Sequence, residues 1–152
     1  MDTIKIINDY DAVRVRQAVR RFALQLGFSM IAQTKIATVA SELARNILNY
    51  AESGEIRINR ISDAGRKGLK LIFQDKGPGI KDVAQALKDG YSSTTSLGMG
   101  LSISRKFSDA FDIESEEGKG TSVVITNWVK SKDVRKPPRF FSSKTVPGSF
   151  SK

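Results

Sequence analysis

Residues 69–79 read Leu69-Lys-Leu-Ile-Phe-Gln-Asp-Lys-Gly-Pro-Gly79, and this stretch decides the fold. Its first half is rich in apolar branched and aromatic residues, a composition typical of a buried β-strand. The strand delivers Asp75 at its end, and Pro78 and Gly79 follow at the two central positions of a type II turn. Residues 55–61 have the same apolar character, so we expect them to form an antiparallel partner strand across the connection 62–68.

Further strands and helices surround this strand pair. Asp11 can cap a helix that runs to Gly27, and a second helical pattern starts at Ile36 and runs to Tyr50. The other expected elements are a strand over 3–7, a short helix over 81–88, a Gly/Ser/Thr-rich loop over 89–100, a helix over 101–107, and a hairpin of strands 111–116 and 121–129 around 117–120. The sum predicts an α+β fold, a two-layer α/β sandwich whose mixed, largely antiparallel sheet has helices on one face.

Composition limits the size and the chemistry of this protein. At 152 residues and 39% hydrophobic, the chain has enough apolar residues for one domain with its own core. The absence of cysteine and histidine excludes a disulfide framework, a thiolate zinc site, a Ser-His-Asp hydrolase and a kinase that phosphorylates its own histidine. The sequence has no secretion signal and no stretch that approaches ~20 apolar residues, so we expect a cytoplasmic protein.

The positive charge is concentrated at one end of the chain. Residues 130–152 contain seven Lys or Arg and one acidic residue, and so hold +6 of the net charge of +9. This segment also contains three of the four prolines, which favours a disordered basic tail. Residues 1–129 would then form the folded domain. The aromatic residues of the tail, Phe140, Phe141 and Phe150, leave a docking role open.

Glu42 and Asn46 form the first candidate catalytic motif. They are four residues apart on the expected helix, so one pocket can receive both side chains. A carboxylate placed there could take the proton from an attacking hydroxyl, and an amide oxygen one turn along could bind Mg²⁺. The alternative is a solvated helix edge in which Glu42 is simply exposed.

Asp75 is the second candidate, because it stands at the mouth of a buried strand. A carboxylate accepts hydrogen bonds only, and is therefore suited to an exocyclic amine such as that of adenine. The alternative is that the Asp75–Gly79 motif is only a turn. Gly98 and Gly100 form the third candidate, because glycines before a helix allow phosphates to approach its free amides. A flexible loop would explain these glycines equally well.

The three motifs together resemble the ATPase superfamily of gyrase, heat-shock chaperones, histidine kinases and mismatch-repair proteins. The resemblance covers residues 1–129, and it is strongest to the short anti-sigma-factor-type serine/threonine kinases of bacteria, especially the RsbT-type switch kinase of the stressosome. The segments 41–47, 68–72, 75–80 and 118–121 carry this similarity. No P-loop motif occurs, and the histidine-containing loop of ordinary protein kinases is impossible here.

The resemblance implies a role for each motif residue. Glu42 would be the catalytic base and Asn46 the magnesium ligand. Asp75 and Gly79 would hold the adenine of ATP with help from Thr121. Gly77, in the same turn, would also bind the nucleotide. The phosphates would be wrapped by Gly98, Gly100 and Leu101, and residues 92–96 would form a short ATP lid.

The same resemblance implies a function and leaves alternatives open. Kinases of this type transfer phosphate from ATP to serine or threonine of a STAS-domain protein, and thereby change which partner is bound. The alternative is a nucleotide-gated binding module that sequesters a sigma factor or activates a phosphatase without phosphate transfer. A nucleic-acid-binding role for the basic tail is disfavoured, because the chain has neither a recognition helix nor a strand pattern of aromatic and basic residues.

Overall fold

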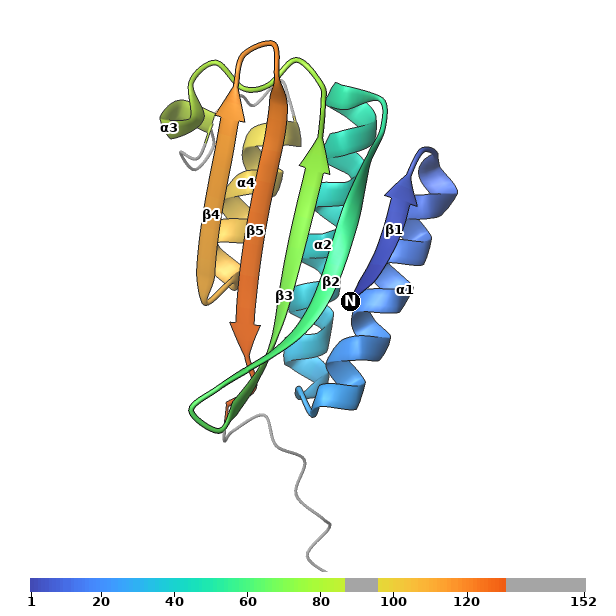
Figure 1. Ribbon diagram of the computed structural model, residues 1–152, viewed down its shortest axis with the longest axis vertical. Coiled ribbons are helices and arrows are strands. Elements are labelled where there is room, and N and C mark those ends of the chain that lie inside the picture. Colours follow the sequence, from blue (N-terminus) through green and yellow to red (C-terminus); the bar gives the residue numbers. More distant parts are fainter. Residues whose placement is uncertain (87–95, 131–152) are drawn as a thin grey trace, which may run out of the picture.

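The computed structural model describes residues 1–86 and 96–130, and these form a five-stranded sheet with helices packed against it. The elements in chain order are β1 (Asp2–Ile6), α1 (Asp9–Leu26), α2 (Met30–Ala51), β2 (Gly54–Asp63), β3 (Arg66–Asp75), α3 (Val83–Ala86), α4 (Ser96–Phe107), β4 (Ala110–Glu116) and β5 (Gly120–Trp128). The helices α1, α2 and α4 cover one face of the sheet (Figure 1). This arrangement confirms the expected α+β sandwich.

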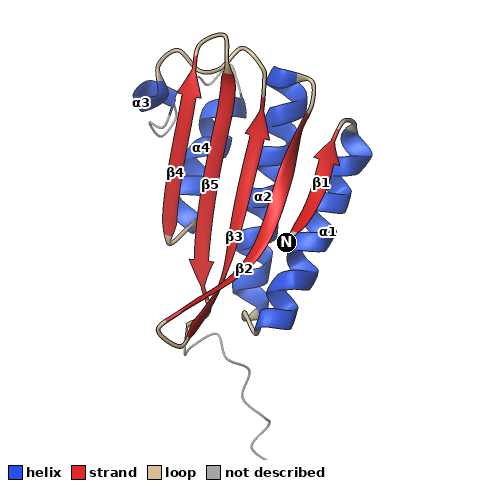
Figure 2. Ribbon diagram, viewed as in Figure 1, coloured by secondary structure: helices blue, strands red, loops and turns tan. Residues whose placement is uncertain are grey.

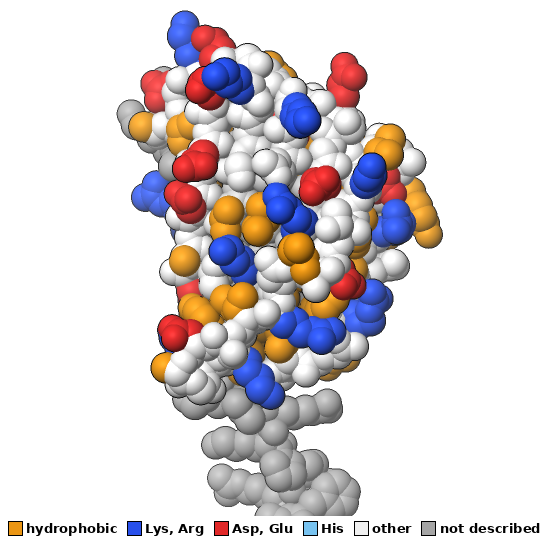
Figure 3. Space-filling view, viewed as in Figure 1, with side chains coloured by type: hydrophobic (Ala, Val, Ile, Leu, Met, Phe, Trp, Pro, Cys, Tyr) orange, Lys and Arg blue, Asp and Glu red, His pale blue; other side chains and the backbone are white. Residues whose placement is uncertain are grey.

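The strand order is β1-β2-β3-β5-β4, and each neighbouring pair is antiparallel. The sheet is therefore antiparallel throughout its described strands. None of the described helices packs against its second face (Figure 2), and Figure 3 shows cationic and anionic side chains interspersed there with hydrophobic ones. Within the described residues, no helix is both long and apolar enough to cross a membrane.

The β2–β3 hairpin is longer than expected. All ten residues of each strand pair, from Gly54 opposite Asp75 to Asp63 opposite Arg66. The connection consists of Ala64 and Gly65, whose φ angles of 51° and 82° are those of a tight hairpin turn. The expected seven-residue connection was wrong because the polar residues on either side of this turn belong to paired strands.

Helix α1 begins one turn earlier than expected. Its N-cap is Asn8, whose side chain accepts a hydrogen bond from the Asp11 N–H at 3.1 Å. The Asp11 carboxylate in turn accepts from the backbone N–H groups of Asn8 and Ile7, at 3.2 and 2.9 Å. These hydrogen bonds lower the pKa of Asp11. Asp11 is therefore the third helical residue of a capping box rather than the cap itself.

Helices α2 and α4 also begin before their apolar patterns do. Ser29 caps α2 and accepts a hydrogen bond from the Ala32 N–H at 3.1 Å, although Met30 and Ile31 of the first turn are exposed. Helix α4 starts at Ser96, so the expected loop ends earlier and the expected helix over 101–107 is its second part. Helix α3 begins at Val83, later than the expected start at residue 81, and residues 87–88 of the expected helix lie outside the described part of the chain.

The core lies between the sheet and the helices, and α2 occupies its centre. Helix α2 packs against α1 on one side and α4 on the other (Figure 1). Its apolar stripe packs against the inward-facing residues of β2 and β3. The largest fully buried apolar side chains of the described residues are Ile6, Val15, Val19, Val39, Ile56, Ile58, Leu69, Leu71, Leu101 and Ile125. The C-terminal end of α2, the end of β3 and the start of β5 consequently meet at one end of the molecule.

Candidate nucleotide-binding site

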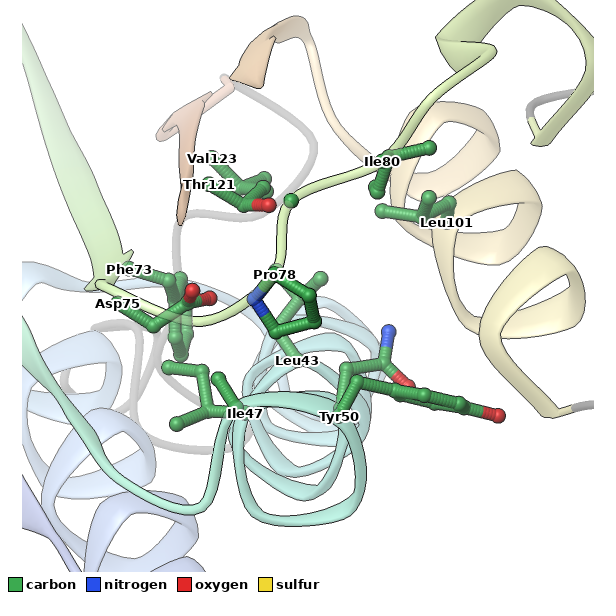
Figure 4. Close-up of a pocket in the computed structure, with 13 residues that line it drawn as sticks. Leu43, Ile47, Tyr50, Phe73, Asp75, Pro78, Ile80, Leu101, Thr121 and Val123 are labelled. Carbon is green, nitrogen blue, oxygen red and sulfur yellow. The ribbon is translucent and has the colours of Figure 1, made fainter. Parts of the chain in front are cut away.

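A pocket opens where these three ends meet and the first turns of α4 close one side (Figure 4). Its cavity volume is about 110 Å³. The residues that line it come from α2, β3, the turn after β3, α4 and β5: Leu43, Asn46, Ile47, Tyr50, Ala51, Phe73, Asp75, Pro78, Gly79, Ile80, Leu101, Thr121 and Val123. Five of the nine predicted site residues, Asn46, Asp75, Gly79, Leu101 and Thr121, therefore share one pocket.

The pocket is mostly apolar, with a few polar groups. Leu43, Ile47, Phe73, Leu101 and Val123 are buried members of the core that also line the pocket. Apolar walls with a small number of convergent polar groups are typical of sites that bind small organic ligands. Apart from Leu101, these apolar residues were not predicted as site residues, because their spacing only marks them as core.

Asp75 is the only carboxylate among the described residues that line the pocket. It is the last residue of β3, and one carboxylate oxygen accepts a hydrogen bond from the Gly77 N–H at 2.8 Å. Burial raises the pKa of Asp75, and hydrogen bonds from the backbone N–H groups of Gly77 and Thr121 partly oppose this rise. The side chain therefore presents a partly desolvated acceptor to the pocket, which suits a ligand that donates N–H groups.

The turn after Asp75 depends on its two glycines in different ways. Gly79 has a φ of 76°, as the third position of a type II turn requires, and a Cβ atom there would collide with the carbonyl oxygen of Glu116. A Cβ atom on Gly77 would instead collide with Ala51 at the end of α2. Gly79 lines the pocket and Gly77 does not. Gly77 thus allows the turn to approach α2, a packing role that the motif alone did not distinguish from ligand binding.

Asn46 projects from α2 toward α4 and lacks a hydrogen-bond partner at its amide nitrogen within the described structure. The residue is only 9% exposed, so this nitrogen is a buried and unsatisfied polar atom. A Cβ atom on Gly100 would lie 3.0 Å from the nitrogen, which makes glycine the residue that leaves room beside Asn46. Asn46 lines the pocket, and its amide nitrogen can donate a hydrogen bond to a polar atom of a ligand.

Glu42 lies one turn before Asn46 on α2 and is half-buried. It is not among the described residues that line the pocket. Glu42 is near the middle of α2, so it lies at the edge of the site rather than inside the pocket.

Gly98 and Gly100 lie inside α4 rather than before it. The expectation that both precede the helix was wrong, because the helix continues through this small-residue segment. Gly100 faces Asn46, and Leu101 is buried against the pocket, whereas Gly98 is in the first turn of α4. Of the predicted lid, residues 92–95 lie outside the described part of the chain.

Tyr50 was missed by sequence reasoning. It follows Asn46 by four residues on α2, and this spacing is the signal that could have placed both on one face. Its ring lies at the rim of the pocket, and the residue is 36% exposed (Figure 4). An aromatic ring at the rim can cover the face of a planar base.

The described residues contain no group of three His, Cys, Asp or Glu side chains that could hold a metal ion. A cation in this pocket would depend on the Asn46 amide oxygen together with oxygens of a bound phosphate and water. That donor set fits Mg²⁺, which keeps several waters and shares phosphate oxygens.

Comparisons with known proteins agree with a nucleotide pocket. Residues 31–131 match the family model described as histidine kinase-, DNA gyrase B- and HSP90-like ATPase. The chain is 41% identical over 127 residues to the serine/threonine-protein kinase RsbT of Bacillus subtilis, an alignment that covers 84% of this chain and 96% of that protein. It is 32% identical over 123 residues to the anti-sigma F factor of Clostridium novyi, covering 76% and 85% of the two chains.

Two solved structures share the fold at low sequence identity. The mycobacterial sensor histidine kinase MprB aligns with a TM-score of 0.51 and 15% identity, over 84% of this chain and 96% of that chain. The catalytic domain of the histidine kinase ThkA aligns with a TM-score of 0.50 and 16% identity, over 85% of this chain and 99% of that chain. At this identity the similarity concerns the fold alone.

Proposed function

Because this chain belongs to the histidine kinase-, DNA gyrase B- and HSP90-like ATPase family, we propose that it is a cytoplasmic, ATP-dependent protein serine/threonine kinase of a bacterial partner-switching pathway. Its substrate is a STAS-domain protein of the stressosome type, and phosphorylation controls the release or binding of a sigma factor or phosphatase. The observation that carries the proposal is the single pocket in which Asp75, Gly79 and Thr121 lie opposite Asn46 and Leu101.

The sheet side of the pocket binds the adenine base. The Asp75 carboxylate accepts a hydrogen bond from the exocyclic amine, and the apolar walls cover the faces of the ring. Tyr50 at the rim shields the base from water. The Gly77 N–H already holds this carboxylate acceptor in place.

The α4 side of the pocket receives the phosphates. The amide nitrogen of Asn46, which has no partner within the described structure, and Gly100, which lies against it, are both at this side. Asn46 would hold Mg²⁺ through its amide oxygen, and the ion when bound neutralises phosphate charge. Gly98 and Leu101 belong to the same first turns of α4 and complete the proposed phosphate-binding segment.

Glu42 is the proposed catalytic base. Its carboxylate takes the proton of the substrate serine or threonine as the hydroxyl oxygen bonds to the γ-phosphorus. The bond between that phosphorus and the bridging oxygen of ADP breaks, and ADP leaves. The half-buried position of Glu42, one turn from Asn46, supports a group that meets a protein substrate at the edge of the site.

A kinase assay with a matched control tests this proposal. The protein is incubated with labelled ATP, magnesium and a STAS-domain protein from the same genome, and label on a serine or threonine is expected. Glu42→Gln keeps the size of the side chain but removes the base, and should abolish transfer while nucleotide binding persists. Glu114→Gln on the open face of the sheet is the control and should transfer normally.

The second candidate is a nucleotide-gated binding module, and similarity to an anti-sigma F factor favours considering it. Such a module needs the pocket but not the base. If wild type binds ATP and retains a STAS-domain protein or sigma factor only in the presence of nucleotide, yet transfers no phosphate, this candidate replaces the kinase.

A further inference from the structure

Ser115 lies behind the pocket and connects three segments that shape it. It is on β4, directly opposite Thr121 of β5 in the strand register. The Ser115 hydroxyl accepts a hydrogen bond from the Ile80 N–H at 2.7 Å. It also lies 3.1 Å from the Gly120 carbonyl oxygen, to which it can donate, and 2.8 Å from the Thr121 hydroxyl oxygen. Ser115 itself does not line the pocket, whereas Thr121 does.

The single proton of Ser115 decides the direction of the hydrogen bond with Thr121. A serine hydroxyl has one donor and two acceptor lone pairs. If Ser115 donates to the Gly120 carbonyl, its lone pairs accept from Ile80 and Thr121, and all three hydrogen bonds form together. If Ser115 donates to Thr121 instead, the hydrogen bond to Gly120 is lost. The first arrangement makes more hydrogen bonds, and it uses the proton of Thr121.

The consequence concerns the polarity of the pocket. A Thr121 hydroxyl that has donated its proton to Ser115 has only lone pairs to offer a ligand. Asp75 is the register partner of Thr121 on β3, and it also offers acceptors (Figure 4). Two neighbouring acceptors match the two N–H groups of an exocyclic amine. A carbonyl oxygen at the same position would face lone pairs from both sides.

We propose that Ser115 is a positioning residue that makes the Thr121 hydroxyl an acceptor toward the pocket, and thereby selects a 6-aminopurine nucleotide over a 6-oxopurine nucleotide. This inference rests on the proposed nucleotide-binding function. It means that β4, which does not line the pocket, contributes to the selectivity for ATP over nucleotides of hypoxanthine or guanine.

Binding of ADP and IDP by calorimetric titration tests the inference, because these nucleotides differ at the purine 6-position and neither undergoes transfer. Wild type should prefer ADP. Ser115→Ala frees the Thr121 proton, so the hydroxyl can turn and donate to a 6-oxo group. The preference for ADP over IDP should then fall about tenfold, the effect of one hydrogen bond.

The ratio of the two affinities separates positioning from general loosening of the pocket. Ser115→Ala also removes the acceptor of the Ile80 N–H, and that loss should weaken both nucleotides alike. Ser115→Thr keeps the hydroxyl and should retain the preference. Ser122→Ala removes a neighbouring hydroxyl from the opposite face of the sheet, and should leave the preference unchanged.

Thr121→Val provides a second route if Ser115→Ala does not fold. It removes the hydroxyl that reads the base but leaves the contacts of Ser115 with Ile80 and Gly120 intact. The preference of Thr121→Val for ADP over IDP should fall to a similar extent. If the double variant Ser115→Ala/Thr121→Val folds, its preference should fall no further than that of either single variant. An unchanged preference in these variants, or equal binding of ADP and IDP by wild type, overturns the inference and leaves the kinase proposal standing. Failure of wild type to bind ADP overturns both.

Discussion

Replacing Asp75 with asparagine should separate nucleotide binding from folding. The asparagine oxygen can still accept the Gly77 N–H that is now 2.8 Å from the carboxylate. Its amide NH₂ group would then face the pocket and meet the exocyclic amine of adenine, donor against donor. Loss of a hydrogen bond to a charged group, together with an unpaired donor, costs about 3–4 kcal/mol. ADP should therefore bind roughly 200- to 1,000-fold more weakly.

Although Asp75→Asn should bind ADP more weakly, its folded state should be at least as stable as that of wild type. Burial raises the pKa of Asp75, so the folded state holds the charged form less favourably than the unfolded state does. As pH rises through and above the ordinary range for aspartate, wild type loses stability at this position and Asp75→Asn does not. The variant should melt at the wild-type temperature or slightly above it at neutral pH.

Calorimetric titration with ADP and thermal unfolding of the same samples measure both effects. Asp112→Asn on the open face of the sheet makes the same chemical change away from the pocket, and should bind ADP as wild type does. If Asp75→Asn binds ADP within about threefold of wild type, the proposed adenine contact is refuted, because one lost charged hydrogen bond alone predicts more than tenfold.

Four other substitutions have distinct expected outcomes. Asp11→Ala should lower the melting temperature at pH 7, and the difference should vanish as pH falls through the lowered pKa of Asp11, in melts recorded from neutral to acid pH. Gly65→Ala should lower the free energy of unfolding by about 1 kcal/mol, because alanine is strained at this left-handed φ. Gly79→Ala should lower it further in denaturant titrations and also weaken ADP binding, because its Cβ atom would collide with Glu116. Asn46→Ala should keep its melting temperature, because the amide nitrogen has no partner within the described structure, but lose phosphate transfer to the STAS-domain protein.

The sequence predicted the sheet side of the site well. The strand before Asp75 is a continuous apolar run, and the Pro78–Gly79 pair has a strong turn preference, so local chemistry decides both. These features depend on residues close together in the chain.

Features that depend on tertiary contacts were predicted less well. The start of α2 was missed because Met30 and Ile31 are exposed, which breaks the apolar pattern at a place where Ser29 still caps the helix. Gly77 needs its small size because of Ala51, which is distant in sequence. The apolar walls of the pocket cannot be distinguished from core by periodicity, since residues such as Leu43 and Val123 belong to both.

The position of β5 has a consequence for how the protein matures on the ribosome. β5, the last strand that the structure describes, inserts between β3 and β4, and it brings Thr121 beside Asp75. A nascent chain that has formed every earlier strand still lacks one wall of the pocket, so the ability to hold nucleotide arrives only when the sheet is complete. Ligand that binds only the finished sheet stabilises it by mass action. Cellular nucleotide would thus favour chains whose synthesis and folding have passed this final step.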